Sequence, residues 1–409
     1  MAASMCIVTV HGIGFQQPPV GDRPGYADAL HANLRHELND RLGDDPERGE
    51  RGGPVYVSSE WKGSPQKGLA RLAPDCPLAA EGKIAHVALV YAPSEPLEPR
   101  LGSVTDVLAR AMLAHNTYTS AVGALRLVFA DAWAALHEHH PATAESTLRP
   151  RQDQRVHGLV SAILHGHRQP EQSTSAGSAE GSPPSDPGAF GTLRALEDDL
   201  ATYVARNDLR ERVRSFVEEA LLSLLDRDDI GGLIVNAHSQ GTVICWDVLC
   251  RLPFLSWVAE GDRRAMRVCN LVTAGSPIRK YVDMFAWGDQ VGQMAALVGD
   301  ESGPMEKGGV GSTGFAWHNF WDRHDPVADP LNPPAAWRPG GPLDERPDGH
   351  HGLLVSLDPS GAERHVSVHD AEVDNVLNSS GGGLQAHDYW SNAAQFVPAL
   401  ARLAGQALP

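Results

Sequence analysis

The sequence predicts an α/β protein with a mostly parallel central sheet flanked by helices. Short apolar segments rich in β-branched residues alternate along the chain with longer segments of helical periodicity. This alternation is typical of parallel sheets, in which a helix connects each strand to the next. The chain has 409 residues, of which 42% are hydrophobic, enough for one large core. We therefore expect a single domain over residues 1–409 that carries helical insertions.

The charge balance argues against nucleic-acid binding. The chain has 51 acidic and 34 basic residues, a formal net charge of −17, and an acidic surface repels phosphate groups. The longest apolar stretch, residues 120–136, contains Arg126 and Asp131 and falls short of a transmembrane helix. No basic region precedes the short apolar run in MAASMCIVTV, so we expect no signal peptide. These features predict a soluble, cytoplasmic protein for which peripheral membrane contact stays open.

The cysteines indicate free thiols. None of the five forms a CxxC pair, and four lie in apolar stretches. Buried thiols in a reducing compartment are therefore expected, in place of disulfides or a redox motif. The positions are Cys6, Cys76, Cys245, Cys250 and Cys269.

The first part of the chain contains three predicted strands and one predicted helix. Residues 6–10, 55–61 and 84–92 are apolar and rich in β-branched or aromatic side chains, as buried strands are. Residues 26–42 place a leucine at every fourth position from Leu30 onward, which predicts a helix with one apolar face.

Residues 94–190 predict a helical insertion or cap. The pattern of 101–166 is mostly helical, whereas 167–190 is rich in Ser, Pro, Gly and Ala. A segment of that composition cannot bury enough apolar surface to fold, so we expect a disordered linker there. A strongly helical pattern then covers residues 191–226.

The second part of the chain resumes the alternation of strands and helices. Strand patterns occur at 231–237, 267–277, 315–322 and 364–369, and helical patterns at 240–251 and 391–405. Residues 281–313 combine an apolar segment with a glycine-rich loop and form a candidate lid.

The stretch LIVNAHSQGTVICWDVL, residues 233–249, brings a serine to a tight turn between a strand and a helix. A nucleophile elbow needs a small residue two positions before its serine and another two positions after, so that strand and helix can approach closely. Ala237 and Gly241 meet this need around Ser239. Two interpretations are open: an activated nucleophile, or an ordinary turn in which Ser239 caps the helix.

A serine nucleophile requires a histidine to accept its proton and a carboxylate to orient that histidine. Asp325 follows the strand pattern of 315–322 and is the preferred acid, because the Pro-Val after it can turn the chain back. Asp322 is the second candidate and Asp329 the third.

The chain contains 19 histidines, and two of them are candidates for the base. His387 is preferred because it lies in the loop between the last predicted strand and the closing helix. Tyr389 and Trp390 can pack beneath that loop. His369 is the competitor, although it lies at the end of the predicted strand itself.

Backbone N–H groups are needed to stabilise the oxyanion that forms during acyl transfer. Gln240, at the start of the helix after the serine, can supply one. Ile13 can supply the other from the run His11-Gly12-Ile13-Gly14, which follows the first strand. A plain glycine turn is the alternative interpretation of this run.

Five short motifs together resemble the α/β-hydrolase superfamily, and most closely its lipases and esterases with a short His-Gly-x oxyanion loop. They are VTVHGIG (8–14), AHSQGT (237–242), VTAGSP (272–277), DPV (325–327) and HDYW (387–390). The resemblance implies the α/β-hydrolase fold and a carboxylic-ester hydrolase without a cofactor. It further implies Ser239 as nucleophile, Asp325 as acid and His387 as base, with Ile13 and Gln240 as oxyanion donors. Residues 94–190 and 281–313 have no counterpart in it.

Functions other than the hydrolysis of small-molecule or lipid esters are compatible with these residues. A thioesterase, amidase or peptidase would use the same residues, and a hydrolase-fold signalling or interaction module would not need catalysis. The histidines His350, His351, His365 and His369 fit no HExxH-like spacing, so we expect no metal site. The sequence leaves the oligomeric state open.

Overall fold

The computed structural model describes a large part of the chain. The described residues are 4–12, 18–19, 22, 24–59, 68–91, 203, 207–253, 256–257, 260–278, 315–323, 325, 327–328, 330–331, 354–357, 363–365, 368–378 and 385–406. The predicted insertion at 94–190, the candidate lid at 281–313 and the third candidate acid Asp329 lie outside them, as do Ile13 and the histidines His350 and His351.

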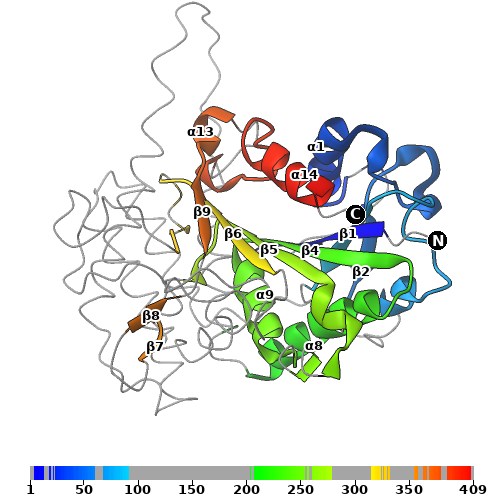
Figure 1. The fold of residues 1–409 in the computed structure, drawn as a ribbon. Coiled ribbons are helices and arrows are strands. Elements are labelled where there is room, and N and C mark those ends of the chain that lie inside the picture. Colours follow the sequence, from blue (N-terminus) through cyan, green and yellow to red (C-terminus); the bar gives the residue numbers. More distant parts are fainter. Residues whose placement is uncertain are drawn as a thin grey trace, which may run out of the picture.

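A seven-stranded sheet forms the centre of the fold, and all of its neighbouring strands are parallel (Figure 1). Its order is β2-β3-β1-β4-β5-β6-β9. The strands are β1 Ser4–Val10, β2 Val55–Ser58, β3 Ala85–Val90, β4 Ile230–His238, β5 Val268–Ala274, β6 Ala316–Trp321 and β9 His369–Glu372. Helices cover both faces of this sheet, which is why its central strands read as continuous apolar runs.

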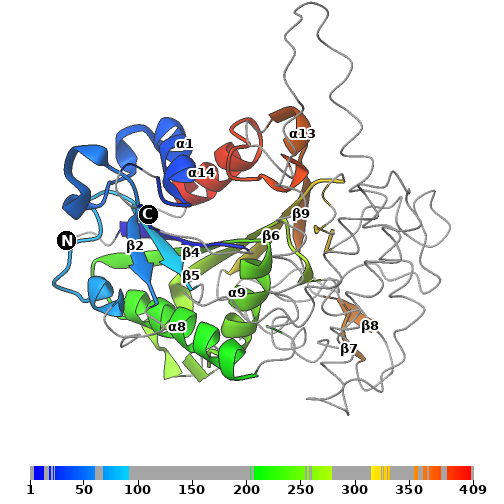
Figure 2. The same ribbon diagram turned by 180° about the vertical axis from the view of Figure 1, so that it is seen from behind.

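Among the helices that the structure describes, two pairs cover the sheet, one pair on each face (Figures 1 and 2). Helices α1 (Asp28–Leu38) and α14 (Phe396–Gln406) pack on one face, and α8 (Asn207–Leu225) and α9 (Gln240–Arg251) on the other. Alternate side chains of the central strands β1 and β4 enter one core or the other. The predicted α/β class with a parallel sheet is confirmed.

The remaining elements are short. Strands β7 (Leu354–Leu357) and β8 (Glu363–His365) form a separate antiparallel pair. The other elements are the one-turn helix α13 (Asn375–Asn378) and the 3₁₀ turns Asn39–Arg41, Pro46–Arg51, Ala70–Leu72, Arg263–Met266 and Gln385–His387. None of the helices that the structure describes is long and apolar enough to cross a membrane.

Two predicted elements differ from those observed. The prediction of a single strand at 364–369 is wrong. Strand β8 ends at His365 in the separate hairpin, and the sheet strand β9 begins at His369. The closing helix was expected at 391–405 but begins at Phe396. The Asn392 side chain turns the chain before it, accepting from the Gln395 N–H at 2.9 Å.

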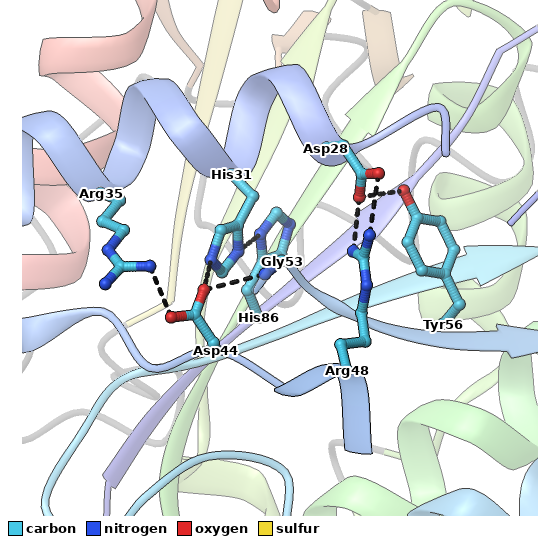
Figure 3. Close-up of polar contacts among 8 residues, drawn as sticks. All are labelled: Asp28, His31, Arg35, Asp44, Arg48, Gly53, Tyr56 and His86. Carbon is cyan, nitrogen blue, oxygen red and sulfur yellow. Dashed lines mark hydrogen bonds and ion pairs between the residues drawn. The ribbon is translucent and has the colours of Figure 1, made fainter. Parts of the chain in front are cut away.

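A buried chain of hydrogen bonds fastens α1 to the sheet (Figure 3). Nε2 of His31 lies 3.0 Å from Asp44 Oδ1 and donates to that carboxylate. Nδ1 of His31 lies 3.0 Å from Nδ1 of His86, whose Nε2 lies 2.8 Å from Thr9 Oγ1. A neutral imidazole has one donor and one acceptor, so His86 donates to His31 and accepts from Thr9. Burial lowers the pKa of both histidines, in agreement with two neutral rings.

A second group of contacts holds the start of α1 (Figure 3). Asp28 accepts from Arg48 Nη1 at 2.7 Å and Nη2 at 3.1 Å, and from the Tyr56 hydroxyl at 3.0 Å. Through the Asp28 carboxylate, the 3₁₀ turn Pro46–Arg51 and strand β2 are both bonded to helix α1.

Candidate active site

The candidate site lies where the order of strands in the sheet reverses. From β1 the chain proceeds through β2 and β3 on one side, and from β4 it proceeds through β5, β6 and β9 on the other. The carboxyl ends of β1 and β4 are therefore adjacent, with Val10 in register with Ala237. Ligands of open α/β sheets bind at such a reversal, outside the carboxyl ends of the strands.

Ser239 occupies a strained turn directly after β4. Its backbone has φ 53° and ψ −128°, and Asn39 is the one other non-glycine residue with positive φ in the described part of the chain. A conformation of this kind costs about 1–3 kcal/mol. Its N–H donates to Ala274 O at 2.9 Å, and its side chain makes no capping hydrogen bond to α9. The alternative that the Ser239 hydroxyl caps the helix is wrong.

Gly241 permits the close approach of α9 to β1. A Cβ at Gly241 would lie 2.2 Å from His11 O and 2.8 Å from Val10 O, closer than any side chain allows. Similarly, a Cβ at Gly12 would lie 2.5 Å from Ser239 Cβ. The loop after β1 therefore contacts the turn that carries Ser239.

The structure brings Asp325 and His387 into direct contact. Asp325 Oδ2 accepts from His387 Nδ1 at 2.7 Å, and its Oδ1 accepts from the Val327 N–H at 2.9 Å. Burial alone would raise the pKa of Asp325, but the charge and hydrogen bond of His387, the Val327 N–H and the Tyr389 hydroxyl together lower it. Asp325 is thus held as a buried carboxylate.

The second candidate acid, Asp322, forms a hydrogen bond with a different residue. Asp322 Oδ2 accepts from the Asn375 N–H at 2.6 Å, at the start of α13. The competing base is also elsewhere, because His369 is exposed and stands at the amino end of β9. Its ring stacks on His318 of β6, with centroids 5.0 Å apart.

His387 lies over the turn that follows β5. A Cβ at Gly275 would be 2.7 Å from His387 Cε1, and Gly275 has φ +64°, so glycine is required on both counts. Gly275 is next to Ala274, which holds the Ser239 N–H. His387 Nε2 and Ser239 Oγ are both buried, and neither has a hydrogen-bond partner among the described residues. Two buried polar atoms without a partner thus lie around the same turn. The Ser239 hydroxyl can donate a proton, and His387 Nε2 can accept one.

His238 is a site residue that the sequence interpretation missed. Its Nε2 donates to the His387 carbonyl oxygen at 2.9 Å, and its ring lies 4.6 Å from that of His387 and 5.1 Å from that of Trp390. Burial, followed by the charge of His387, lowers the pKa of His238 to about 3, so the ring is neutral. Its place immediately before Ser239 was the signal available in the sequence.

His11 and Tyr91 fix the backbone at Gly12. His11 Nδ1 donates to Gly12 O at 2.8 Å, and its Nε2 accepts from the Tyr91 N–H at 3.3 Å. The Tyr91 hydroxyl also donates to Gly12 O at 2.8 Å, and the two rings stack with centroids 4.0 Å apart. Burial lowers the pKa of His11 to about 3. Of the two expected oxyanion donors, Gln240 is the buried first residue of α9, where the helix dipole is positive.

No group of three or more metal-ligating side chains gathers within the described ranges of the chain. No protein-family model, curated protein or solved structure matches the sequence or the fold. The chemistry of the site must therefore be inferred from its own geometry.

Proposed function

We propose that the protein is a serine hydrolase of the α/β-hydrolase fold that cleaves carboxylic esters. The observation that carries this proposal is the buried, unpaired Ser239 hydroxyl on a strained turn. Its neighbour His238 bonds to the carbonyl of His387, which in turn bonds to Asp325. A structural serine would satisfy its buried hydroxyl with a hydrogen bond. Strain and an unpaired polar atom at one residue are typical of a catalytic position.

The strand order supports this fold. Ser239 follows β4, Asp325 follows β6 and His387 follows β9, in the chain order of α/β-hydrolases. Because the carboxyl ends of parallel strands lie along one edge, this order would bring the three residues together from distant parts of the chain.

In the proposed reaction, His387 Nε2 accepts the proton of Ser239 Oγ as the oxygen attacks the ester carbonyl. The oxyanion is stabilised by the N–H groups of Ile13 and Gln240. The imidazolium then protonates the leaving alkoxide, and the acyl group remains on Ser239. Water, deprotonated by His387, releases the acid and restores the serine. Asp325 keeps the His387 proton on Nδ1, so that Nε2 is free to act.

A substrate series tests this proposal. We expect hydrolysis of p-nitrophenyl acetate, butyrate or octanoate by the wild type, and loss of that activity in Ser239→Ala. Matched p-nitroanilides and thioesters, assayed beside the esters, separate an esterase from an amidase or a thioesterase. Folded protein that cleaves none of the three classes would contradict the proposal and favour an interaction module.

A further inference from the structure

Tyr389 stands two residues after the candidate base and contacts the candidate acid. Its side chain is fully buried. Its hydroxyl oxygen lies 2.9 Å from the Asp322 backbone N and 2.9 Å from Asp325 Oδ2. The same carboxylate oxygen receives His387 Nδ1 at 2.7 Å.

The direction of these hydrogen bonds is determined by the atoms involved. The Asp322 N–H can only donate, so the Tyr389 oxygen accepts from it. The one hydroxyl proton is then directed to Asp325 Oδ2, which can only accept as a carboxylate. Burial, and then the charge of Asp325, raises the pKa of Tyr389 well above its ordinary value, so the hydroxyl keeps this proton.

We propose that Tyr389 is a positioning residue that stabilises the Asp325 carboxylate and thereby lowers the pH at which the His387–Asp325 pair takes up a proton. The proposal deepens the function proposed above and rests on it for its catalytic meaning. The predicted packing role of Tyr389 beneath the histidine loop would not require a hydroxyl, whereas this role does.

The direction of the shift in the pH midpoint follows from how the negative charge of Asp325 is compensated. When His387 is neutral, Asp325 carries an uncompensated negative charge, and the Tyr389 hydroxyl stabilises it strongly. When His387 is protonated, the positive ring already compensates that charge, and the hydroxyl contributes less. The hydroxyl therefore favours the unprotonated pair, so its removal must raise the pH midpoint of the pair.

The other ionisable groups around the pair do not replace this contact. His238 faces His387 from the turn after β4 and is neutral, as described above. Asp322 faces Tyr389 from the end of β6, but its carboxylate accepts from the Asn375 N–H. Asp388 accepts from the Ser391 N–H at 3.3 Å and from the Ser391 hydroxyl.

The test compares Tyr389→Phe with Tyr203→Phe. Tyr203 is a matched control because it is also buried and donates to a buried carboxylate, Asp247 Oδ2 at 2.8 Å. Protein labelled with ¹³Cε1-histidine is titrated by NMR, with the His387 signal assigned from its absence in His387→Gln. The midpoint is expected to rise by about one pH unit in Tyr389→Phe and to stay in place in Tyr203→Phe.

The pH profile of kcat/KM for p-nitrophenyl acetate is recorded on the same variants. Its acidic limb should move upward with the NMR midpoint in Tyr389→Phe. An unchanged midpoint in folded Tyr389→Phe would overturn the positioning role even if the enzyme is active. A shifted midpoint in a protein that hydrolyses no ester would refute the hydrolase and leave the hydrogen-bond role standing.

A second variant serves if Tyr389→Phe does not fold. Site-specific 3-fluorotyrosine at position 389 retains both hydrogen bonds and makes the hydroxyl a stronger donor. The midpoint should then fall below that of the wild type. A midpoint that rises or does not move would contradict the proposal, because a stronger donor to Asp325 must lower it.

Discussion

His387 Nδ1 lies 2.7 Å from Asp325 Oδ2, although 62 positions separate the two residues in the chain. Asp325 comes just after β6, and His387 ends the 3₁₀ turn between α13 and α14. The fold alone assembles this pair, and a buried carboxylate bonded to an imidazole is the arrangement that makes a histidine an effective base.

Asp325→Asn and Asp322→Asn should separate the two candidate acids. Asp325→Asn is expected to reduce kcat/KM for an ester by about 10³–10⁴-fold, because the amide no longer orients and stabilises the protonated His387. Asp322→Asn weakens an acceptor for the Asn375 N–H and should lower the free energy of unfolding by about 1–2 kcal/mol, with a far smaller loss of activity. Steady-state kinetics and urea denaturation check both. The reverse result would exchange the roles of the two aspartates.

The strain at Ser239 predicts a difference in stability between two variants at this position. Glycine adopts φ 53° without strain, whereas alanine keeps the strain of the serine. Ser239→Gly should therefore be more stable than Ser239→Ala by about 1 kcal/mol, after the larger chain entropy of glycine is subtracted. Thermal melting of the two proteins measures this. Equal stability, or a more stable alanine variant, would mean that the turn is not strained.

Gly241→Ala should be strongly destabilising. The new Cβ would meet two backbone carbonyl oxygens, which cannot move aside without displacing β1. We expect a loss of about 2 kcal/mol or more in the free energy of unfolding. Gly405→Ala in α14 is the matched control, since its Cβ would meet only the tip of Arg41 at 3.3 Å. That change should be neutral or stabilising, because alanine favours a helix.

Stability should decrease as the pH falls from about 6.5 to 4. The pKa of His11 and that of His238 are lowered by burial to about 3, so these rings stay neutral in the folded state. In the unfolded chain they take up protons near pH 6.5. The unfolded state then binds more protons, and each such histidine removes about 1.4 kcal/mol of stability per pH unit. Urea unfolding between pH 7.5 and 5 measures the slope, and a flat profile would contradict this prediction.

The histidine pair under α1 allows a matched test of the same effect. A proton added to His31 would meet the Nδ1–H of His86 across their 3.0 Å contact (Figure 3). A proton added to His86 would instead lie on its Nε2, which accepts from the Thr9 hydroxyl at 2.8 Å. His86→Gln should therefore reduce the pH slope by about one proton, or 1.4 kcal/mol per pH unit. His36→Gln on the exposed side of α1 should leave the slope unchanged.

Much of this structure was predictable because it depends on local patterns. The seven-strand sheet follows from short apolar runs between helical segments, and helix α9 was predicted with its observed ends. The turn at Ser239 follows from the small residues at 237 and 241, which the close contact of Gly241 with β1 explains.

Contacts between distant segments were harder to predict. The sequence preferred Asp325 to Asp322 and His387 to His369 from their places after predicted strands. It could not show that the two preferred residues are in contact, because their hydrogen bond joins segments 62 positions apart. The hydrogen bond of His238 to the His387 carbonyl was missed because it joins segments 149 positions apart.

Covalent labelling of Ser239 tests the central proposal most directly. Purified protein is incubated with a fluorophosphonate probe beside Ser239→Ala and His387→Ala, each shown to be folded by circular dichroism, and the adduct is located by mass spectrometry. We predict an adduct on Ser239 in the wild type, none in Ser239→Ala, and labelling slowed by at least about 10²-fold in His387→Ala. Folded wild-type protein that stays unlabelled, or labelling that does not depend on His387, would contradict the proposed triad.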